Sequence, residues 1–162
     1  MDAHLLTRRI RAWLIFFIGA LAISGITAVP LLAELRLLRV VLDSQPWIAS
    51  LWPDLIRWIG LVDAALIDTY GKYPFLAYGT DWLAFAHIVI AVAFVGPLHD
   101  PVRNVWVIEF GMMACILVIP AALIFGALRG IPFYWRLIDC SFGVIGIIPL
   151  WLVRRDILRL AG

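Results

Sequence analysis

The chain has 162 residues, of which 64% are hydrophobic and only 15% are charged. Soluble proteins average about 25% charged residues, so a soluble globular domain is excluded. Thirteen Lys and Arg residues against eleven Asp and Glu residues leave a formal charge of +2, and the basic residues are scattered along the chain. Because nucleic-acid binding normally needs a massed basic stripe, we expect no nucleic-acid partner and predict an all-α integral membrane protein.

The first predicted span covers residues 12–33, which carry no formal charge. A helix of that length is about 33 Å long and crosses the hydrocarbon core. An arginine-rich segment precedes it, as in a signal peptide, but the apolar run is too long for a signal core, so retention is favoured. Ala20, Ser24 and Ala28 recur at every fourth position, which either brings a second helix close or reflects the abundance of small residues in membrane helices.

Residues 34–79 form a long connection that is too apolar for a polar loop. Arg36, Arg39 and Asp43 share a helical spacing, which predicts that the first helix continues beyond the bilayer core with one wet face. Pro53 is predicted to open a second, amphipathic helix. Its polar side would carry Asp54, Arg57, Ala64 and Asp68, and its apolar side Leu55, Ile56, Ile59, Val62 and Leu66. The neighbouring Trp and Tyr residues favour a largely helical segment at the non-cytoplasmic membrane interface, the alternative being a small cap folded over the bundle.

Three more predicted spans follow in close succession, namely residues 82–98, 105–128 and 133–153. Asp100 and Pro101 are expected to start the third span, and Gly130 and Pro132 to end it and start the fourth. Because these connections are short, the helices should be antiparallel neighbours. The sequence therefore predicts one membrane domain, residues 1–162, folded as an antiparallel bundle of four spans.

The placement of Lys and Arg residues predicts the orientation. If the N-terminus is cytoplasmic, seven arginines lie on short inner segments and six basic residues lie on a much longer outer length. Basic residues are denser on the cytoplasmic side of membrane proteins. Both termini are therefore expected in the cytoplasm, with the bacterial plasma (inner) membrane as the expected location and an organellar membrane as the alternative.

Ionisable side chains inside spans are costly, and each is a candidate functional residue. On the outer side this topology gathers Asp81, His87, Arg136 and Asp139. A hydrogen bond between His87 and Asp139, with Arg136 one turn away, would form a proton site or hold an anionic or quinone head group. The favoured interpretation is structural: Arg136 and Asp139 neutralise each other, Asp81 serves the first turn of its own helix, and His87 bonds a nearby carbonyl.

On the inner side Glu109 is the costly residue, one to two turns inside the third span. Arg154, on the adjacent antiparallel helix, is its expected countercharge, giving a clasp between helices. A proton relay or cation site is the alternative, but a single carboxylate is weak support for it. Cys115 and Cys140 differ in depth by roughly 9 Å, too far for a disulfide.

No metal-site, hydrolase or phosphate-loop motif occurs in the sequence, so neither a metal nor a cofactor is expected and enzymatic activity is left open. The favoured function is an accessory, assembly or scaffolding subunit of a larger membrane complex, with membrane lipids and other membrane subunits as partners. One alternative is a small enzyme or carrier for a lipid, quinone or isoprenoid that uses His87, Arg136 and Asp139. Another is a pigment-binding subunit with His87 as the ligand.

Overall fold

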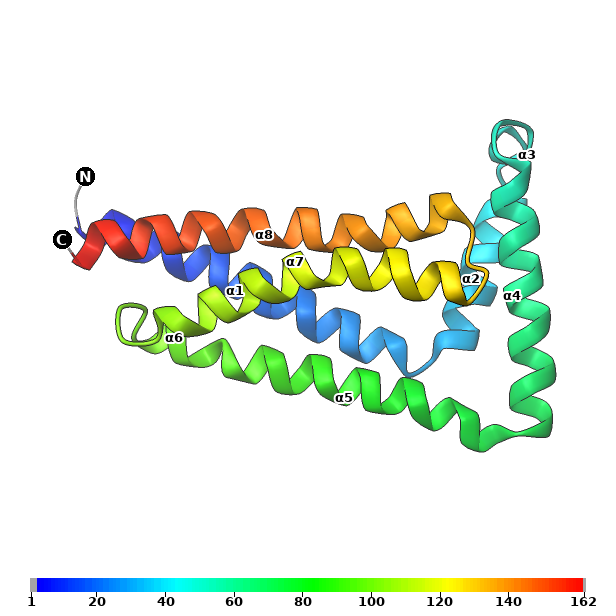
Figure 1. The fold of residues 1–162 in the computed structure, drawn as a ribbon, viewed down its shortest axis with the longest axis horizontal. Coiled ribbons are helices and arrows are strands. Elements are labelled where there is room, and N and C mark those ends of the chain that lie inside the picture. Colours follow the sequence, from blue (N-terminus) through cyan, green and yellow to red (C-terminus); the bar gives the residue numbers. More distant parts are fainter. Residues whose placement is uncertain (1–2, 162) are drawn as a thin grey trace. The chain divides into compact units, whose positions relative to one another are not determined.

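The computed structural model describes residues 3–161, which contain helices and no strand (Figure 1). The order of elements is α1 (Ala3–Ala28), α2 (Leu31–Asp43), α3 (Pro46–Leu51), α4 (Pro53–Lys72), the 3-10 helix η1 (Pro74–Ala77), α5 (Tyr78–Ala93), α6 (Val95–His99), α7 (Val105–Leu128) and α8 (Phe133–Ala161). The prediction of an all-α fold is confirmed.

Four helical segments are long and apolar enough to cross a membrane: Ala3–Ala28, Pro74–His99, Val105–Leu128 and Phe133–Ala161. Each contains one of the predicted spans or most of it, so the four-span fold of an integral membrane protein is confirmed. Their outward surfaces carry large apolar side chains, such as Phe16, Val92, Leu117 and Phe142, which are more than half exposed. That exposure is what contact with lipid requires and water would penalise.

The first helix does not continue to Asp43, so that prediction is wrong. Helix α1 ends at Ala28, a turn covers residues 29 and 30, and α2 begins at Leu31. Pro30 explains the break, because its ring nitrogen cannot donate the backbone hydrogen bond that a continuing helix needs. Three later helices, α3, α4 and η1, begin at a proline.

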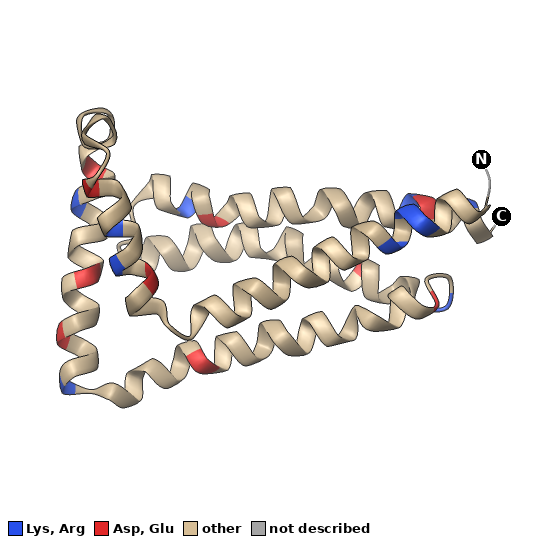
Figure 2. Ribbon diagram, turned by 180° about the vertical axis from the view of Figure 1, so that it is seen from behind, with Lys and Arg blue, Asp and Glu red and all other residues tan. Residues whose placement is uncertain are grey.

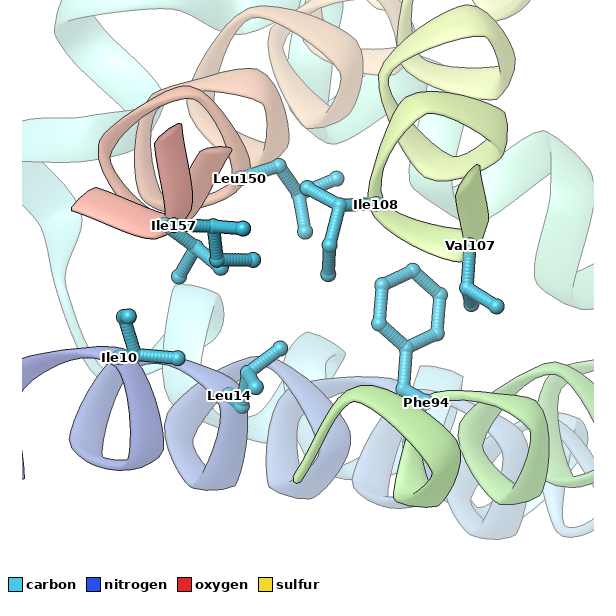
Figure 3. Packing of buried hydrophobic residues seen from close by; sticks show 8 residues of the cluster. Ile10, Leu14, Phe94, Val107, Ile108, Leu150 and Ile157 are labelled. Carbon is cyan, nitrogen blue, oxygen red and sulfur yellow. The ribbon is translucent and has the colours of Figure 1, made fainter. Parts of the chain in front are cut away.

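Two groups of residues are each compact and are described separately: residues 3–21 with 90–161, here called the bundle unit, and residues 22–89, here called the central unit. In the bundle unit, α7 and α8 lie side by side and antiparallel (Figure 1). A core of fully buried side chains joins parts of all four spans (Figure 3), consisting of Ile10, Leu14, Phe94, Val107, Ile108, Leu150, Val153 and Ile157. Lipid supplies no hydrophobic force between helices, so close packing of this kind holds the spans together.

Glycines allow the close approach of helices in the bundle unit. A Cβ on Gly143 of α8 would overlap the carbonyl oxygen of Cys115 in α7. A Cβ on Gly111 of α7 would lie 2.6 Å from Cζ of Phe94. Both positions therefore exclude a side chain, and α7 approaches its neighbours more closely than any larger residue permits.

In the central unit, α4 begins at Pro53 as predicted. Its expected faces are found: Asp54, Arg57, Ala64 and Asp68 are exposed, whereas Ile59 is buried and the other four apolar residues are partly buried. Helix α2 packs on α4, so these residues form a folded helical pair.

The close approach between α1 and α5 in the central unit occurs at Gly25. Its Cβ would lie 3.0 Å from the carbonyl oxygen of Ala84 and 3.0 Å from Cβ of His87. Ser24, one of the small residues singled out from the sequence, is exposed although it directly precedes Gly25. Gly25, which has no side chain at all, permits the approach.

Candidate functional site

A fully buried carboxylate, Asp156, lies on α8 at the end of the bundle unit where α1 begins. Its Oδ2 is 3.2 Å from Nη2 of Arg9 on α1, and its Oδ1 is 3.5 Å from Nη2 of Arg155. The Asp156 side chain is 0% exposed, whereas that of Arg9 is 42% exposed. An arginine has the length to reach from a buried acid to the polar surface, so the pair ties α1 to α8 without burying both charges.

Arg155 also has an aromatic partner. Its guanidinium carbon lies 5.2 Å from the ring centroid of Trp151, one turn earlier on α8, in a cation–π contact. Its Nε is buried and has no hydrogen-bond acceptor in the described structure. The aromatic face and the Asp156 carboxylate therefore provide the stabilisation for this cation.

A second ion pair at this end joins α7 to α8. Nε of Arg154 donates to Oε1 of Glu109 at 2.9 Å, with side-chain exposures of 39% and 45%. The structure thus brings together the two residues that the sequence suggested as a clasp. With the Arg9–Asp156 pair it forms a group of charges near the start of α1 and the end of α8 (Figure 2), which we call the latch: Arg9, Glu109, Arg154, Arg155 and Asp156.

Sequence reasoning missed Asp156, although a signal was present. Leu150, Val153 and Ile157 are buried on one stripe of α8, and Asp156 lies three residues after Val153 on the same side. An acid inside an apolar stripe needs a countercharge. The partner Arg9 comes from a distant helix, which the spacing within α8 does not reveal.

The start of α7 differs from the prediction. Residues 101–104 form a turn, and α7 begins at Val105 with Asn104 at the N-cap position. Asp100 instead closes the turn, because its Oδ1 accepts a hydrogen bond from the backbone N–H of Arg103 at 3.0 Å. Nδ2 of Asn104 donates to the carbonyl oxygens of Asp100 and Gly96. The turn residues are therefore held by their own side chains.

The four residues of the predicted outer cluster are divided between the two units. Asp81 and His87 belong to the central unit, and Arg136 and Asp139 belong to the bundle unit. Their grouping into one site stays a prediction. Asp81 is exposed in the first turn of α5, beside a shallow apolar hollow that is also lined by Tyr78, Trp82 and Phe85.

His87 makes a hydrogen bond within its own helix. Its Nδ1 lies 2.8 Å from the carbonyl oxygen of Leu83. A carbonyl only accepts hydrogen bonds, so a neutral His87 carries its proton on Nδ1 and presents Nε2 as a lone pair. This arrangement is the one expected of a structural histidine, and it also leaves one nitrogen able to bind a ligand.

Arg136 and Asp139 do not pair with each other. Within residues 3–161 no ion pair of 4.0 Å or less includes either side chain. Nη1 of Arg136 instead donates to the carbonyl oxygen of Leu123 at 3.4 Å, and its guanidinium lies 5.4 Å from the ring centroid of Phe133. Asp139 is partly buried. Mutual neutralisation on one helix face therefore does not occur in this conformation.

A further buried acid, Asp63, lies on α4 in the central unit. Its Oδ2 accepts a hydrogen bond from Nη1 of Arg39 on α2 at 2.6 Å, while Oδ1 is buried without a partner. A small hollow beside this pair is lined by Arg39, Leu42, Asp43, Ile56, Ile59 and Gly60. The pair links α2 to α4 in the same way as the latch links the helices of the bundle unit.

Among residues 3–161, no three His, Cys, Asp or Glu side chains gather closely enough to hold a metal ion. Both cysteines, Cys115 and Cys140, are free thiols. The chain matches no protein-family model, no curated protein and no solved structure.

Proposed function

We propose that this small membrane protein is an accessory, assembly or scaffolding subunit of a larger membrane complex. The observation that carries the proposal is the latch, because its charged side chains form ion pairs between helices. Arg9 and Asp156 join α1 to α8, and Glu109 and Arg154 join α7 to α8. Ion pairs between helices, one of them built on the buried Asp156, favour one arrangement of the helices, which suits a subunit that holds a fixed shape.

A surface for a partner is available on α1. Ala20 and Ser24 are exposed on this helix one turn apart. Small residues at this spacing let a second backbone approach closely in lipid. We take this face as the contact with another membrane subunit, and both termini as cytoplasmic in a bacterial plasma membrane. The clustered basic residues near the start of α1 and the end of α8 favour that orientation (Figure 2).

The experiment is extraction of the tagged, full-length protein from its native membrane in a mild detergent, followed by mass measurement of the intact particle. We expect a heterologous membrane protein at fixed stoichiometry. Replacing Ala20 and Ser24 together by leucine should release it, because the larger side chains hold the helices apart. Ala114→Leu is the control, since Ala114 is exposed on α7 and gains the same volume as Ala20 does in the α1 variant.

Three results would contradict the proposal. Free monomers of 18.2 kDa from native membranes would show that no partner subunit is bound. A complex made only of copies of this chain would show self-association instead of binding to another subunit. Loss of the partner in Ala114→Leu as well as in the α1 variant would show a general packing defect rather than a contact through Ala20 and Ser24.

His87 supports a second candidate function. Because Nδ1 is engaged with the Leu83 carbonyl, Nε2 is free to ligate the metal of a pigment or to accept a proton from a lipophilic substrate. Ligand-binding histidines commonly have their second ring nitrogen fixed in this way. The role would be that of a pigment-binding subunit, or of an enzyme or carrier for a lipid, quinone or isoprenoid.

Visible absorbance of the purified protein tests pigment binding, and lipid analysis of the same sample tests a bound quinone or isoprenoid. His87→Ala should abolish either signal. The control is Thr80→Ala, which removes a side-chain hydrogen bond to the carbonyl of Ala77 at the start of the same helix. A protein without absorbing or extracted ligand, or an unchanged ligand content in His87→Ala, would reject this second function.

A further inference from the structure

Arg136 differs from the other basic residues of the described chain. Every other Lys or Arg side chain in residues 3–161 either has an acidic partner within 4.0 Å or is exposed. Arg136 is partly buried and has no such partner, and its Nε is buried without an acceptor. The hydrogen bond from its Nη1 to the Leu123 carbonyl oxygen is long at 3.4 Å. A guanidinium in this position lacks the anion that a cation within a span requires.

The surrounding residues hold Arg136 in place. Its stem crosses α7 at Gly126, where a Cβ would lie 2.5 Å from both Cγ and Cδ of the arginine. The ring of Phe133 lies beside its guanidinium. Glycine on one side and an aromatic ring on the other thus leave a slot that the arginine fills, so its position is set by the fold.

The position of Arg136 along α8 identifies the missing anion. It is the fourth residue of α8, about 5 Å from the helix start, a depth from which an arginine is long enough to reach the lipid head groups. Arg129, exposed at the C-cap of α7 in the same hairpin, adds a second positive charge. The one acid in this part of the hairpin, Asp139, does not reach Arg136 within 4.0 Å. Phosphate is the anion found at this depth, and a guanidinium binds it with two parallel hydrogen bonds.

We propose that Arg136 binds the phosphate of an anionic phospholipid at the α7–α8 hairpin. Gly126 and Phe133 position the guanidinium, and Arg129 contributes to the attraction. The occupant is a lipid rather than free phosphate, because the exposed apolar side chains of the hairpin, such as Phe125 and Leu128, offer contacts to acyl chains. This inference is independent of the proposed scaffolding function.

The experiment measures phospholipid binding to the full-length protein in detergent by native mass spectrometry. Dioleoyl phosphatidylglycerol is titrated in parallel with dioleoyl phosphatidylcholine, which has the same chains and no net charge. Arg136→Gln should weaken binding of the tightest phosphatidylglycerol by roughly fivefold, the effect of one basic residue at a lipid surface. Arg103→Gln is the matched control, since it removes an exposed arginine of the turn before α7 and should leave that affinity unchanged.

Gly126→Ala provides a second variant that keeps the charge. Its added methyl group should displace the flexible arginine stem without disturbing the backbone, and so weaken the same lipid. Gly19→Ala is its control, because a Cβ there meets nothing within 4 Å. Three results would overturn the proposal: wild-type affinity in both Arg136→Gln and Gly126→Ala, equal losses in Arg103→Gln, or displacement of the lipid by excess inorganic phosphate. If Arg136→Gln does not fold, Gly126→Ala decides alone.

Discussion

Replacing Arg9 by glutamine is expected to destabilise the protein more than replacing its partner Asp156 by asparagine. The two side chains form one ion pair but differ in exposure, 42% for Arg9 and 0% for Asp156. Without Arg9, the buried carboxylate keeps only Arg155, whose Nη2 is 3.5 Å away on the adjacent residue. Without the carboxylate, both arginines still reach the polar surface. The cost of losing one partner therefore depends on which charge is left buried.

The magnitudes follow from that difference. A fully buried charge that loses its partner costs about 3–5 kcal/mol, and Arg155 places the Arg9→Gln variant near the lower limit of that range. An arginine that is partly exposed behaves more like a member of a surface pair, so Asp156→Asn should cost about 1 kcal/mol. The double variant removes both charges and should be more stable than Arg9→Gln alone, by about 1–2 kcal/mol.

The measurement is the free energy of unfolding in mixed micelles of dodecyl maltoside and dodecyl sulfate, followed by far-ultraviolet circular dichroism. Arg8→Gln is the control, because Arg8 is an exposed neighbour with the same charge and should change stability by less than about 0.5 kcal/mol. If Asp156→Asn costs as much as Arg9→Gln, or if the double variant shows the sum of the two losses, the buried-carboxylate reasoning is refuted.

Further substitutions test the packing inside each unit, two of them in the same unfolding assay and one by proteolysis. Gly143→Ala should cost about 1–3 kcal/mol, since its methyl group would meet the rigid carbonyl of Cys115; an unchanged stability would show that α7 and α8 are further apart. Phe94→Ala should cost about 3–5 kcal/mol because this ring is fully buried in the core, and a loss below 1 kcal/mol would contradict that. Arg39→Gln should destabilise the central unit, measured as faster proteolysis of α2 and α4, because it leaves Asp63 buried without its partner; equal cleavage rates would argue against the pair.

Features determined by a single segment could be predicted from the sequence. Pro53 opens α4 because its missing N–H costs nothing in a first turn, and the polar and apolar sides of α4 follow from helical spacing alone. The four spans follow from length and apolar composition. The contact of Glu109 with Arg154 could also be predicted. The short connection makes α7 and α8 neighbours, and few basic residues lie at the depth of Glu109.

Features that depend on which helices meet could not be predicted. Asp63 lies on the apolar side of α4. Its partner Arg39 lies on α2, which is separated from α4 in the sequence by α3 and two short connections. The close approach at Gly25 depends on how α1 crosses α5. Helical periodicity gives the direction of a side chain around its own axis and contains no information on the crossing point of two axes.

The buried acids of this protein share one arrangement, and it explains why Arg136 stands apart. Asp156 and Asp63 are short side chains enclosed by apolar residues, and each takes its countercharge from an arginine on another helix that stays 42% or 49% exposed. The long side chain connects the buried acid to the polar surface, so each pair is neutral inside and solvated outside. Where the arginine is the partly buried member, as with Arg136, no Asp or Glu side chain of residues 3–161 comes within 4.0 Å of it. An anion from outside the protein fills that role most simply, and at the end of a span the lipid phosphate is already there.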